Sequence, residues 1–474
     1  MARADHDVPP RIVHDNEGGG ALDSYFHISA RGSSVRTEIL AGLATFLTMS
    51  YILFVNPAIL GSVKDHQGVS LPFPAVLTVT ALVAGVMTIL MGVYGRYPFA
   101  LAAGLGLNAF VAFTLVGADG LSWPQAMGVI VTEGIIISVL VLTGFREAVL
   151  NAIPMDLKLS IGIGIGLFIA LIGLVGGHVV VHTPDSGTVV TMNSNLRSWP
   201  VAVFFIGLMF TATLVAKKVR GALLLGIVGT TVLATIVNEA DHLKLWSDGV
   251  AAVPHKIVSA PDFSLVGHFS FSFWGALGFV TAAVTVLAVM LSDFFDTMGT
   301  VVGIGGEAGF LDEDGRLPGI KRVLLVDSLA AAAGGAASAS SNTTYIESAA
   351  GVSDGGRTGL TSVVVGVLFL FCLFISPIAG VIPAEATAPI LVIVGYFMMT
   401  VVSRIDWTDP GIGIPALLTI VMMPFTYSIT NGVGAGFISF TIIALLRGRW
   451  REVSPLMYVI SALFAVYFIH GLLV

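Results

Sequence analysis

The chain has 474 residues, of which 55% are hydrophobic and only 11% are charged, and its formal net charge at pH 7 is −7. Soluble domains carry about 25% charged residues, so the composition excludes an ordinary soluble domain, argues against a nucleic-acid partner and predicts a polytopic membrane protein in a lipid bilayer. Residues 1–34 form the one long polar block, so no separate soluble domain is expected.

The N-terminal stretch 1–34 is polar, lacks the apolar segment that signal peptides carry, and contains Arg3, Arg11 and Arg31. It therefore predicts a cytoplasmic tail. The single cysteine, Cys372, lies in an apolar stretch, and without a second cysteine no disulfide forms within the chain.

Hydropathy and turn residues predict fourteen membrane-spanning segments. They cover residues 35–60, 74–93, 100–117, 124–144, 157–177, 199–216, 221–238, 274–302, 321–337, 341–353, 358–378, 386–403, 411–428 and 431–447. The last two are separated because one helix over 411–447 would measure ~55 Å against a bilayer core of ~30 Å. The stretch SITNGVGAG at its middle is also typical of a turn. A further apolar stretch, 455–473, either crosses the membrane or lies against it.

Charged residues in the loops predict the orientation. With the tail inside, the cytoplasmic loops carry most of the Lys and Arg, as the positive-inside rule requires. These loops hold Arg96, Arg146, Lys158, Lys217, Lys218, Arg220, Arg316, Lys321, Arg322, Arg357, Arg404, Arg447, Arg449 and Arg451, whereas the outside loops hold Lys64, Arg197, Lys244 and Lys256. A multi-pass protein of the cell membrane (inner or plasma membrane) with a cytoplasmic N-terminus is expected.

Two predicted segments differ from ordinary spans. Seven segments precede the connection 238–272 and seven follow it, and an odd number places the two halves in opposite orientations, as in an inverted repeat. The third segment, FALAAGLGLNAFVAF, and the tenth, GGAASASSNTTYIESAAGV, are short and rich in small or polar residues. Residues 341–343 offer an N-cap for a helix of about a dozen residues. Each segment is expected to be extended backbone followed by a half-helix, whose first N–H groups face a polar ligand near the bilayer midplane.

Carboxylates stand out in this apolar chain. Asp293 and Asp296 follow an apolar run without charge, and on a helix they share one face with Thr297 and Thr300. Each ionised carboxylate costs about 2.5–3.5 kcal/mol at the membrane centre, and no Lys or Arg occurs within a nearby predicted span. Their partners are other carboxylates, hydroxyls, helix N-termini, a proton, a cation or a ligand. Glu347, about one turn into the tenth half-helix, is the expected companion.

A structural reading competes with the functional one, since Ser and Thr on neighbouring helices also accommodate buried acids. We favour function for Asp293 and Glu347 and leave Asp296 between the two readings. Glu133 is expected to be structural, and Asp327 is expected either to brace the tenth segment or to relay protons. His178 and His182 have a spacing compatible with a metal but no third ligand, so no metal site and no cofactor is expected.

Four motifs carry a resemblance to a known family. RGSSVRTEILAGLATFLTMSYILFVNPAIL, GLGLNAF, DFFDTMGT and SNTTYIESAAGVSDGGRTGLTS resemble the motifs of AzgA-like purine permeases, a branch of the nucleobase:cation symporters in the nucleobase-ascorbate transporter superfamily. The resemblance runs from about residue 31 to residue 453. It implies an all-α fold of fourteen spans in two inverted seven-helix repeats.

The same resemblance implies a division into domains. A transporter domain over 35–453 would contain a core (35–144 and 274–378) and a gate (157–238 and 386–447) that move against each other like an elevator. The C-terminal hydrophobic segment 454–474 lies outside the fourteen-span pattern.

The resemblance also implies a substrate site between the third and tenth half-helices. Asp293 and Glu347 are carried over as base-binding acids, Asn108 as a site residue and Asp296 as a functional neighbour. Thr297 stands where some relatives of other branches have a histidine or an acid, which leaves the proton-carrying group open. The expected substrate-binding residues are Asp293, Glu347, Asn108, Thr344, Tyr345 and Phe294, and the expected proton-coupling residues are Asp293, Asp296 and Asp327.

Residues and resemblance together predict a secondary active transporter that imports adenine, guanine and hypoxanthine by proton symport. Carboxylates accept hydrogen bonds from the N–H groups of a purine, and backbone N–H groups donate to its carbonyl or ring nitrogen. A carboxyl group in a low-dielectric site also holds a proton readily, so base and proton load together. Phe110, Phe294 and Tyr345 are candidates for stacking on the ring. The preferred base, proton against sodium coupling, and the assembly, with a homodimer as one candidate, are left open.

Two rival classes fit less well. A sulfate-type anion transporter would require a basic group at the half-helix ends, where this chain has acids. An intramembrane protease would require aspartates on facing helices, whereas Asp293 and Asp296 lie on one predicted helix. The chain is therefore not expected to be an enzyme.

Overall fold

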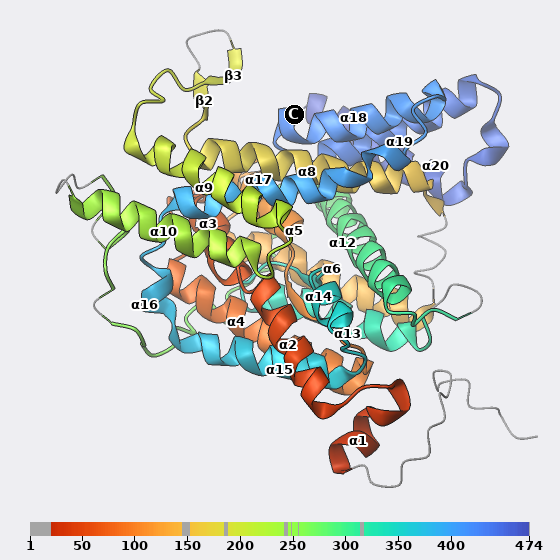
Figure 1. Cartoon of the computed structure of the whole chain (residues 1–474). Coiled ribbons are helices and arrows are strands. Elements are labelled where there is room, and N and C mark those ends of the chain that lie inside the picture. Colours follow the sequence, from red (N-terminus) through yellow and green to blue (C-terminus); the bar gives the residue numbers. More distant parts are fainter. Residues whose placement is uncertain are drawn as a thin grey trace, which may run out of the picture.

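The computed structural model describes residues 20–144, 152–183, 188–240, 245–247, 249–254, 256–312 and 317–473. Apolar helices dominate these ranges, and nine helices within them are long and apolar enough to cross a membrane. The chain is an all-α membrane protein that also contains two short strand pairs, and Figure 1 shows its helices stacked in two layers.

The first half of the chain alternates long helices with short connections. Its elements are α1 (Ala21–Phe26), η1 (Ser29–Arg31), α2 (Val35–Met49), α3 (Ile52–Gly61), α4 (Phe73–Leu90), η2 (Met91–Gly95), β1 (Leu101–Ala103), α5 (Leu105–Ala109), η3 (Phe110–Ala118), α6 (Trp123–Thr143), α8 (Met155–Gly176), β2 (Val180–Thr183), β3 (Thr188–Met192), α9 (Trp199–Ala216) and α10 (Ala222–Ala240).

The second half repeats this plan and adds one helix at its end. Its elements are α11 (Phe273–Leu277), α12 (Phe279–Glu307), α13 (Ile320–Ala336), β4 (Asn342–Thr344), α14 (Ser348–Ser353), α15 (Gly359–Phe371), η5 (Cys372–Phe374), α16 (Ser376–Ala379), α17 (Ala384–Met399), η6 (Thr400–Arg404), α18 (Pro410–Thr426), α19 (Ile429–Leu446), η7 (Trp450–Glu452) and α20 (Pro455–Leu473). Each of the fourteen predicted segments contains a helix, and the division within 411–447 is confirmed by the turn between α18 and α19.

Local sequence signals set several helix starts. The Ser34 side chain accepts from the backbone of Thr37 at the start of α2, and Ser428 does the same at the start of α19. Ser122 and Gln125 form a capping box before α6. Such caps satisfy N–H groups that have no acceptor within the helix.

The helices pack in two groups that both mix the two halves of the chain. In one group α13 packs on α6, α15 on α2 and α4, and α14 on α2. In the other, α8 packs on α17 and α18, α9 on α10 and α17, and α18 on α19. Figure 1 shows the first group in the lower part of the view and the second in the upper part, with α12 running between them.

Glycines allow the close approach of α8 to its neighbours. A Cβ at Gly166 would lie 2.6 Å from Cβ of Met398, and one at Gly164 would lie 3.1 Å from Cα of Ile420. The small residues at these two positions thus permit close helix packing.

Hydrogen bonds and ion pairs join the loops predicted on the cytoplasmic side to one another. They connect Arg31 to the carbonyls of Arg96 and Arg357, Tyr97 to Pro318, Lys321 to Leu142, Arg220 to Asp354, and Asp406 to Asp156. We call this surface the positive face. The opposite loops also contact one another, linking Asp65 to Trp123, Thr78 to Asp262, Gln125 to Ser272 and Trp246 to Glu385. The connections named here therefore lie on two separate faces of the described part of the chain.

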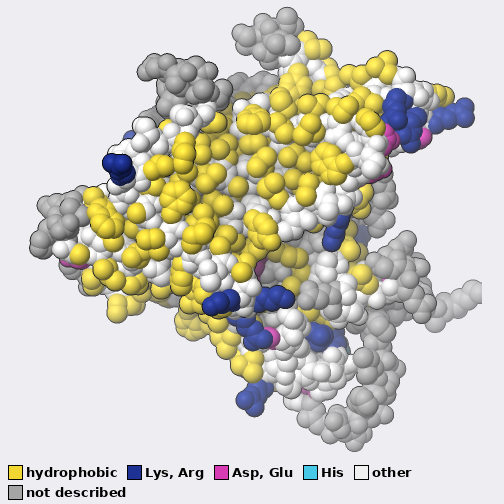
Figure 2. Space-filling view, turned by 45° about the horizontal axis from the view of Figure 1, so that its top comes forward, with side chains coloured by type: hydrophobic (Ala, Val, Ile, Leu, Met, Phe, Trp, Pro, Cys, Tyr) yellow, Lys and Arg dark blue, Asp and Glu magenta, His cyan; other side chains and the backbone are white. Residues whose placement is uncertain are grey.

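Apolar side chains cover the surface between the two faces. On α9 and α10 the exposed ones include Phe205, Ile206, Met209, Phe210, Leu225, Val228, Val232 and Ile236. Figure 2 shows yellow side chains over a broad band, with dark-blue Lys and Arg mainly along its lower and right-hand margins. This distribution fits a surface that contacts lipid.

The C-terminal helix α20 lies antiparallel to α19. The Ser461 hydroxyl is 2.7 Å from that of Thr441, whereas Phe464 and Phe468 approach Gly434, nearer the start of α19. The rings of Phe437 and Phe464 meet edge to face. The apolar stretch at 455–473 thus packs along a helix of the second group.

Candidate functional site

Two short strands pair at the middle of the fold. β1 and β4 pair antiparallel, with Leu101 opposite Thr344 and Ala103 opposite Asn342. The tyrosine after β4 extends the link, because Tyr345 N donates to the carbonyl of Ala100 and its hydroxyl donates to the carbonyl of Ala103. Extended backbone followed by a short helix, as predicted for the third and tenth segments, is confirmed in both.

The expected helix start in the tenth segment is wrong. Residues 341–343 do not cap a helix, because Asn342–Thr344 form strand β4 and α14 begins only at Ser348. Glu347 therefore lies at the N-cap of α14 and not one turn into it. Pairing with β1, a partner more than two hundred residues away in the chain, extends the backbone through these residues.

A cavity of about 90 Å³ lies beside the strand pair, where the third and tenth segments meet. Its walls combine the backbone around Gly104–Gly106 with polar side chains from α12 and from the end of β4, and α17 closes it from the other group. The lining residues are Tyr51, Gly104, Leu105, Gly106, Asp296, Thr300, Thr344, Tyr345, Ile346, Glu347, Val394 and Met398. We call it the central cavity.

Four of the predicted site residues, Asp296, Thr344, Tyr345 and Glu347, line the central cavity. Asp296 is exposed to it, and Glu347 is half-buried. Tyr51, which we did not predict, donates a hydrogen bond of 2.6 Å from its hydroxyl to Oε1 of Glu347. The sequence feature that could have indicated Tyr51 is a tyrosine within the first apolar span, directly after Thr48-Met49-Ser50.

The other three predicted substrate residues lie behind the cavity wall. Asn108, Asp293 and Phe294 are fully buried and are not among its lining residues. Neither amide atom of Asn108 has a hydrogen-bond partner among the described residues. On α12, therefore, Asp296 and Thr300 face the cavity whereas Asp293 faces the protein interior.

Asp327 braces the tenth segment. Its Oδ1 accepts from the backbone N–H and the hydroxyl of Thr344, at 2.9 and 2.8 Å, and its Oδ2 accepts from the hydroxyl of Thr297 at 2.6 Å. The Thr297 oxygen also lies 2.8 Å from that of Thr343. These contacts fix β4 against α12 and α13, which is the bracing that the sequence offered as one of two alternatives.

Glu133 lies with the buried acids and not apart from them. It comes from α6, is fully buried, and neighbours both Asp293 and Asp327. Glu133 therefore belongs to the cluster of buried acids, although the sequence predicted a structural role for it.

A larger opening leads from the central cavity toward the positive face. This space, about 290 Å³, shares Gly106, Asp296, Thr300, Ile346 and Met398 with the central cavity. We call it the vestibule. Its outer part is lined by Lys158 of α8 and Arg404 of η6.

The opposite side of the same interface is packed with aromatic rings. Phe168 of α8 is fully buried, with ring centroids 6.4 Å from Phe113 and 5.3 Å from Tyr427. The Thr114 hydroxyl donates to the carbonyl of Tyr427, which joins the two helix groups at this point. Beyond the rings lies a separate apolar pocket of about 250 Å³, lined among others by Val55, Phe113 and Tyr427.

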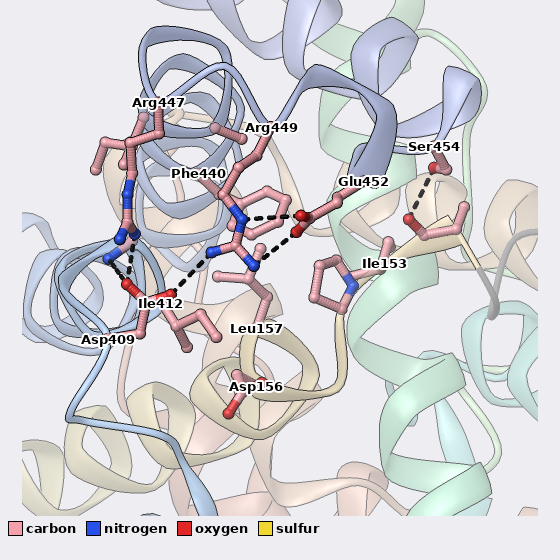
Figure 3. A pocket seen from close by; sticks show the side chains of 15 residues that line it. Ile153, Asp156, Leu157, Asp409, Ile412, Phe440, Arg447, Arg449, Glu452 and Ser454 are labelled. Atoms are coloured by element: carbon pink, nitrogen blue, oxygen red, sulfur yellow. Dashed lines mark hydrogen bonds and ion pairs between the residues drawn. The ribbon is translucent and has the colours of Figure 1, made fainter.

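A pocket of about 340 Å³ on the positive face, shown in Figure 3, contains paired charges. Arg447 and Arg449 both contact Asp409, and Arg449 also binds Glu452 at 2.8 Å. The Arg447 guanidinium lowers the pKa of the Asp409 carboxyl to about 2, so this ion pair persists throughout the physiological pH range. These contacts tie the start of α18 to the end of α19, and none of the predicted site residues lies here.

Comparisons with known proteins give a matching family and relatives of nearly the same length. A family model described as a permease family (Xan_ur_permease) matches residues 36–434. The adenine permease AdeQ of Escherichia coli (strain K12) is 40% identical over 448 residues, covering 94% of this chain and 96% of that one. The guanine/hypoxanthine permease PbuG of Bacillus subtilis (strain 168) is 39% identical over 452 residues, covering 94% and 99%.

Two solved structures share the fold. The transmembrane domain of a cyanobacterium bicarbonate transporter, BicA, has a TM-score of 0.59 at 14% identity, covering 85% of this chain and 97% of that one. The murine anion transporter Slc26a9 in its inward-facing state has a TM-score of 0.61 at 11% identity, covering 92% and 74%. At such identities the likeness concerns the fold alone.

Proposed function

The chain belongs to the permease family, and from that premise we propose that it is a secondary active transporter that imports purine nucleobases, among them adenine, guanine and hypoxanthine, by proton symport. Relatives with 38–40% identity over nearly the whole chain are named as adenine or guanine/hypoxanthine permeases. Membership makes the chain a transporter and not an enzyme, and the expected resemblance is confirmed at the level of the family.

The observation that carries the proposal is the chemistry of the central cavity. A neutral purine presents N–H donors and carbonyl or ring-nitrogen acceptors along its edge. Glu347 and Asp296 supply acceptors, and the hydroxyls of Thr344 and Thr300 supply donors as well as acceptors. The first N–H groups of the helix that begins at Leu105 have no acceptor within that helix and lie at the same wall. Tyr345 offers an aromatic surface.

The remaining predicted residues act from behind this wall in the proposed mechanism. Asn108 packs behind the start of α5, and Phe294 packs α12 in place. Asp293, beside Glu133, holds the coupling proton, while Asp327 keeps β4 in position and Asp296 links base and proton. Loading of the base and of the proton is thereby coupled through one turn of α12.

The proposed topology has fourteen spans in two inverted repeats, with the two helix groups acting as core and gate. The mixing of both halves in each group supports this division, as does the likeness to BicA and Slc26a9. With the positive face in the cytoplasm of a cell-membrane protein, the vestibule opens inward and the ring cluster around Phe168 seals the outside. Elevator-like sliding of the core along α8 would exchange the two sides.

Anion transport is the rival suggested by the two solved structures. The walls of the central cavity contain Asp296 and Glu347 and no Lys or Arg among the lining residues. An anion would meet like charge there, whereas a neutral base with N–H donors is accommodated.

Binding to the purified protein tests the proposal. Guanine, hypoxanthine or adenine is expected to raise the melting temperature, since a ligand at about 100 times its Kd adds about 2.7 kcal/mol, while the matching nucleosides have little effect. In proteoliposomes, uptake of labelled hypoxanthine is expected to follow a pH gradient without sodium. Stabilisation by guanosine equal to that by guanine, or stabilisation by sulfate alone, contradicts the proposal.

A further inference from the structure

The vestibule carries charges that a neutral base does not require. Lys158 is half-buried in its wall, and its Nζ lies 5.8 Å from the centroid of the Phe295 ring. Arg404 is exposed at the outer end of the same space. Neither makes an ion pair with any acid in the part of the chain that the structure describes.

Three other cations of the positive face are paired with acids. Arg220 pairs with Asp354, Arg447 with Asp409, and Arg449 with Glu452. Lys158 and Arg404 differ from these three cations because they make no ion pair among the described residues. They differ from exposed cations such as Lys217 and Lys218 because they line a space continuous with the central cavity.

The arrangement of charge along this space is ordered. Glu347 lines the central cavity only, Asp296 lines both spaces, and Lys158 and Arg404 line the vestibule only. A ligand that reaches from one end to the other would carry N–H donors at its inner end and negative charge at its outer end. The vestibule, at about 290 Å³, is close to the ~300 Å³ at which pockets for drug-sized molecules begin.

We propose that the vestibule binds a purine 5′-mononucleotide from the cytoplasm, with its base at the central cavity and its phosphate on Lys158 and Arg404, and that this binding inhibits transport. The inference rests on the proposed function and adds a regulatory ligand to the same site. A phosphate monoester carries a charge of about −1.5 to −2 at pH 7, and Arg and Lys are the side chains that bind it, Arg through its fork of N–H groups and Lys as a point charge.

Inhibition follows from which helices hold each end of the nucleotide. Glu347 belongs to the N-cap of α14 in the first helix group and Asp296 to α12, which runs between the groups, whereas the cations belong to α8 and η6 in the second group. A nucleotide bound at both ends bridges the two groups and opposes their sliding. A free base makes no contact with the cations and leaves the groups free to move. The nucleotide formed from imported base would thus limit further import.

Competition binding on the full-length purified protein tests this inference. Protein with bound labelled guanine is titrated in parallel with guanosine 5′-monophosphate, guanosine, ribose 5-phosphate or inorganic phosphate, and the displacement of guanine is measured. The monophosphate is expected to displace guanine at least about tenfold better than guanosine does, and the two sugar- or phosphate-only probes are expected to have little effect. In proteoliposomes the monophosphate is expected to slow guanine uptake without being transported.

The variant Lys158→Gln/Arg404→Gln identifies the phosphate contacts. Its ratio of the inhibition constant of the monophosphate to the Kd of guanine, both measured on the same preparation, is expected to rise at least about tenfold. Lys217→Gln/Lys218→Gln, which removes two exposed cations of the same face outside the vestibule, is expected to leave that ratio unchanged. Lower ionic strength is expected to strengthen inhibition in the parent only.

Three results overturn the inference. They are displacement by the monophosphate no better than by guanosine, displacement by inorganic phosphate equal to that by the monophosphate, and an equal change of the ratio in the two double variants. Failure of guanine to bind at all would remove the proposed function and this inference together, whereas guanine binding without displacement by the monophosphate removes the inference alone.

Discussion

The carboxylates near the centre of the molecule form two layers that differ in surroundings. Asp296 and Glu347 line the central cavity, whereas Asp293, Asp327 and Glu133 have no exposed surface. Asp293 and Asp296 are separated by less than one turn of the same helix. A polar stripe on one helix is therefore not one site. In the proposed mechanism the front layer contacts the substrate, and the back layer stores the proton and braces β4.

Substitution of Asp293 in the back layer is expected to have the largest effect on transport. Asp293→Asn resembles a permanently protonated carboxyl, so it should bind base within about threefold of the parent yet abolish accumulation, leaving the internal and external concentrations equal. Uptake of labelled guanine into proteoliposomes under a pH gradient measures this, with equilibrium binding alongside. Continued concentrative uptake by the variant would assign the proton to another group.

A large effect on binding is expected at Glu347. Glu347→Gln keeps the shape but replaces an acceptor oxygen by a donor facing both Tyr51 and the base, so base binding should weaken by roughly 1–3 kcal/mol, or about 5- to 150-fold. Equilibrium binding of guanine measures it. Glu452→Gln, which alters an exposed acid in the pocket of Figure 3, is the matched control and should bind like the parent. Parental affinity in Glu347→Gln would remove this residue from the front layer.

The smallest effect is expected at Asn108, behind the cavity wall. Asn108→Ala leaves the cavity lining unchanged and removes only a buried side chain that packs behind the start of α5. Affinities should therefore fall about two- to tenfold, and the ranking of adenine, guanine and hypoxanthine should shift. Competition by unlabelled bases, with the amount of protein in the membrane measured in parallel, checks this. Identical affinities for all three bases would leave Asn108 a packing residue.

Hydropathy and composition were sufficient for much of the fold. Long apolar helices need only local information, so every predicted segment contains a helix and the split before α19 is correct. The half-helices were also predictable, because small and polar residues interrupt apolar runs in the third and tenth segments. The strands β1 and β4 were not, since their pairing joins distant parts of the chain and overrides the capping preference of Ser341 and Asn342.

The residue types of the site were predictable, but which of these residues line the cavity and which are enclosed behind it was not. Helical periodicity places Asp293 and Asp296 on one face, but only packing against α6 and α13 decides that one is enclosed and the other faces the cavity. Tyr51 and the vestibule cations Lys158 and Arg404 were missed for the same reason, because a tyrosine in a span and cations at helix ends are ordinary features of membrane proteins.

The most direct measurement is a structure determined with guanine bound. The account predicts a planar density in the central cavity, between the Gly104–Gly106 backbone and Glu347, with a ring N–H about 2.7–3.2 Å from the Glu347 carboxylate and with Asp293 outside contact distance. Guanine in the apolar pocket beside Phe113, or in the pocket of Figure 3, with no density between Asp296 and Glu347, would contradict it.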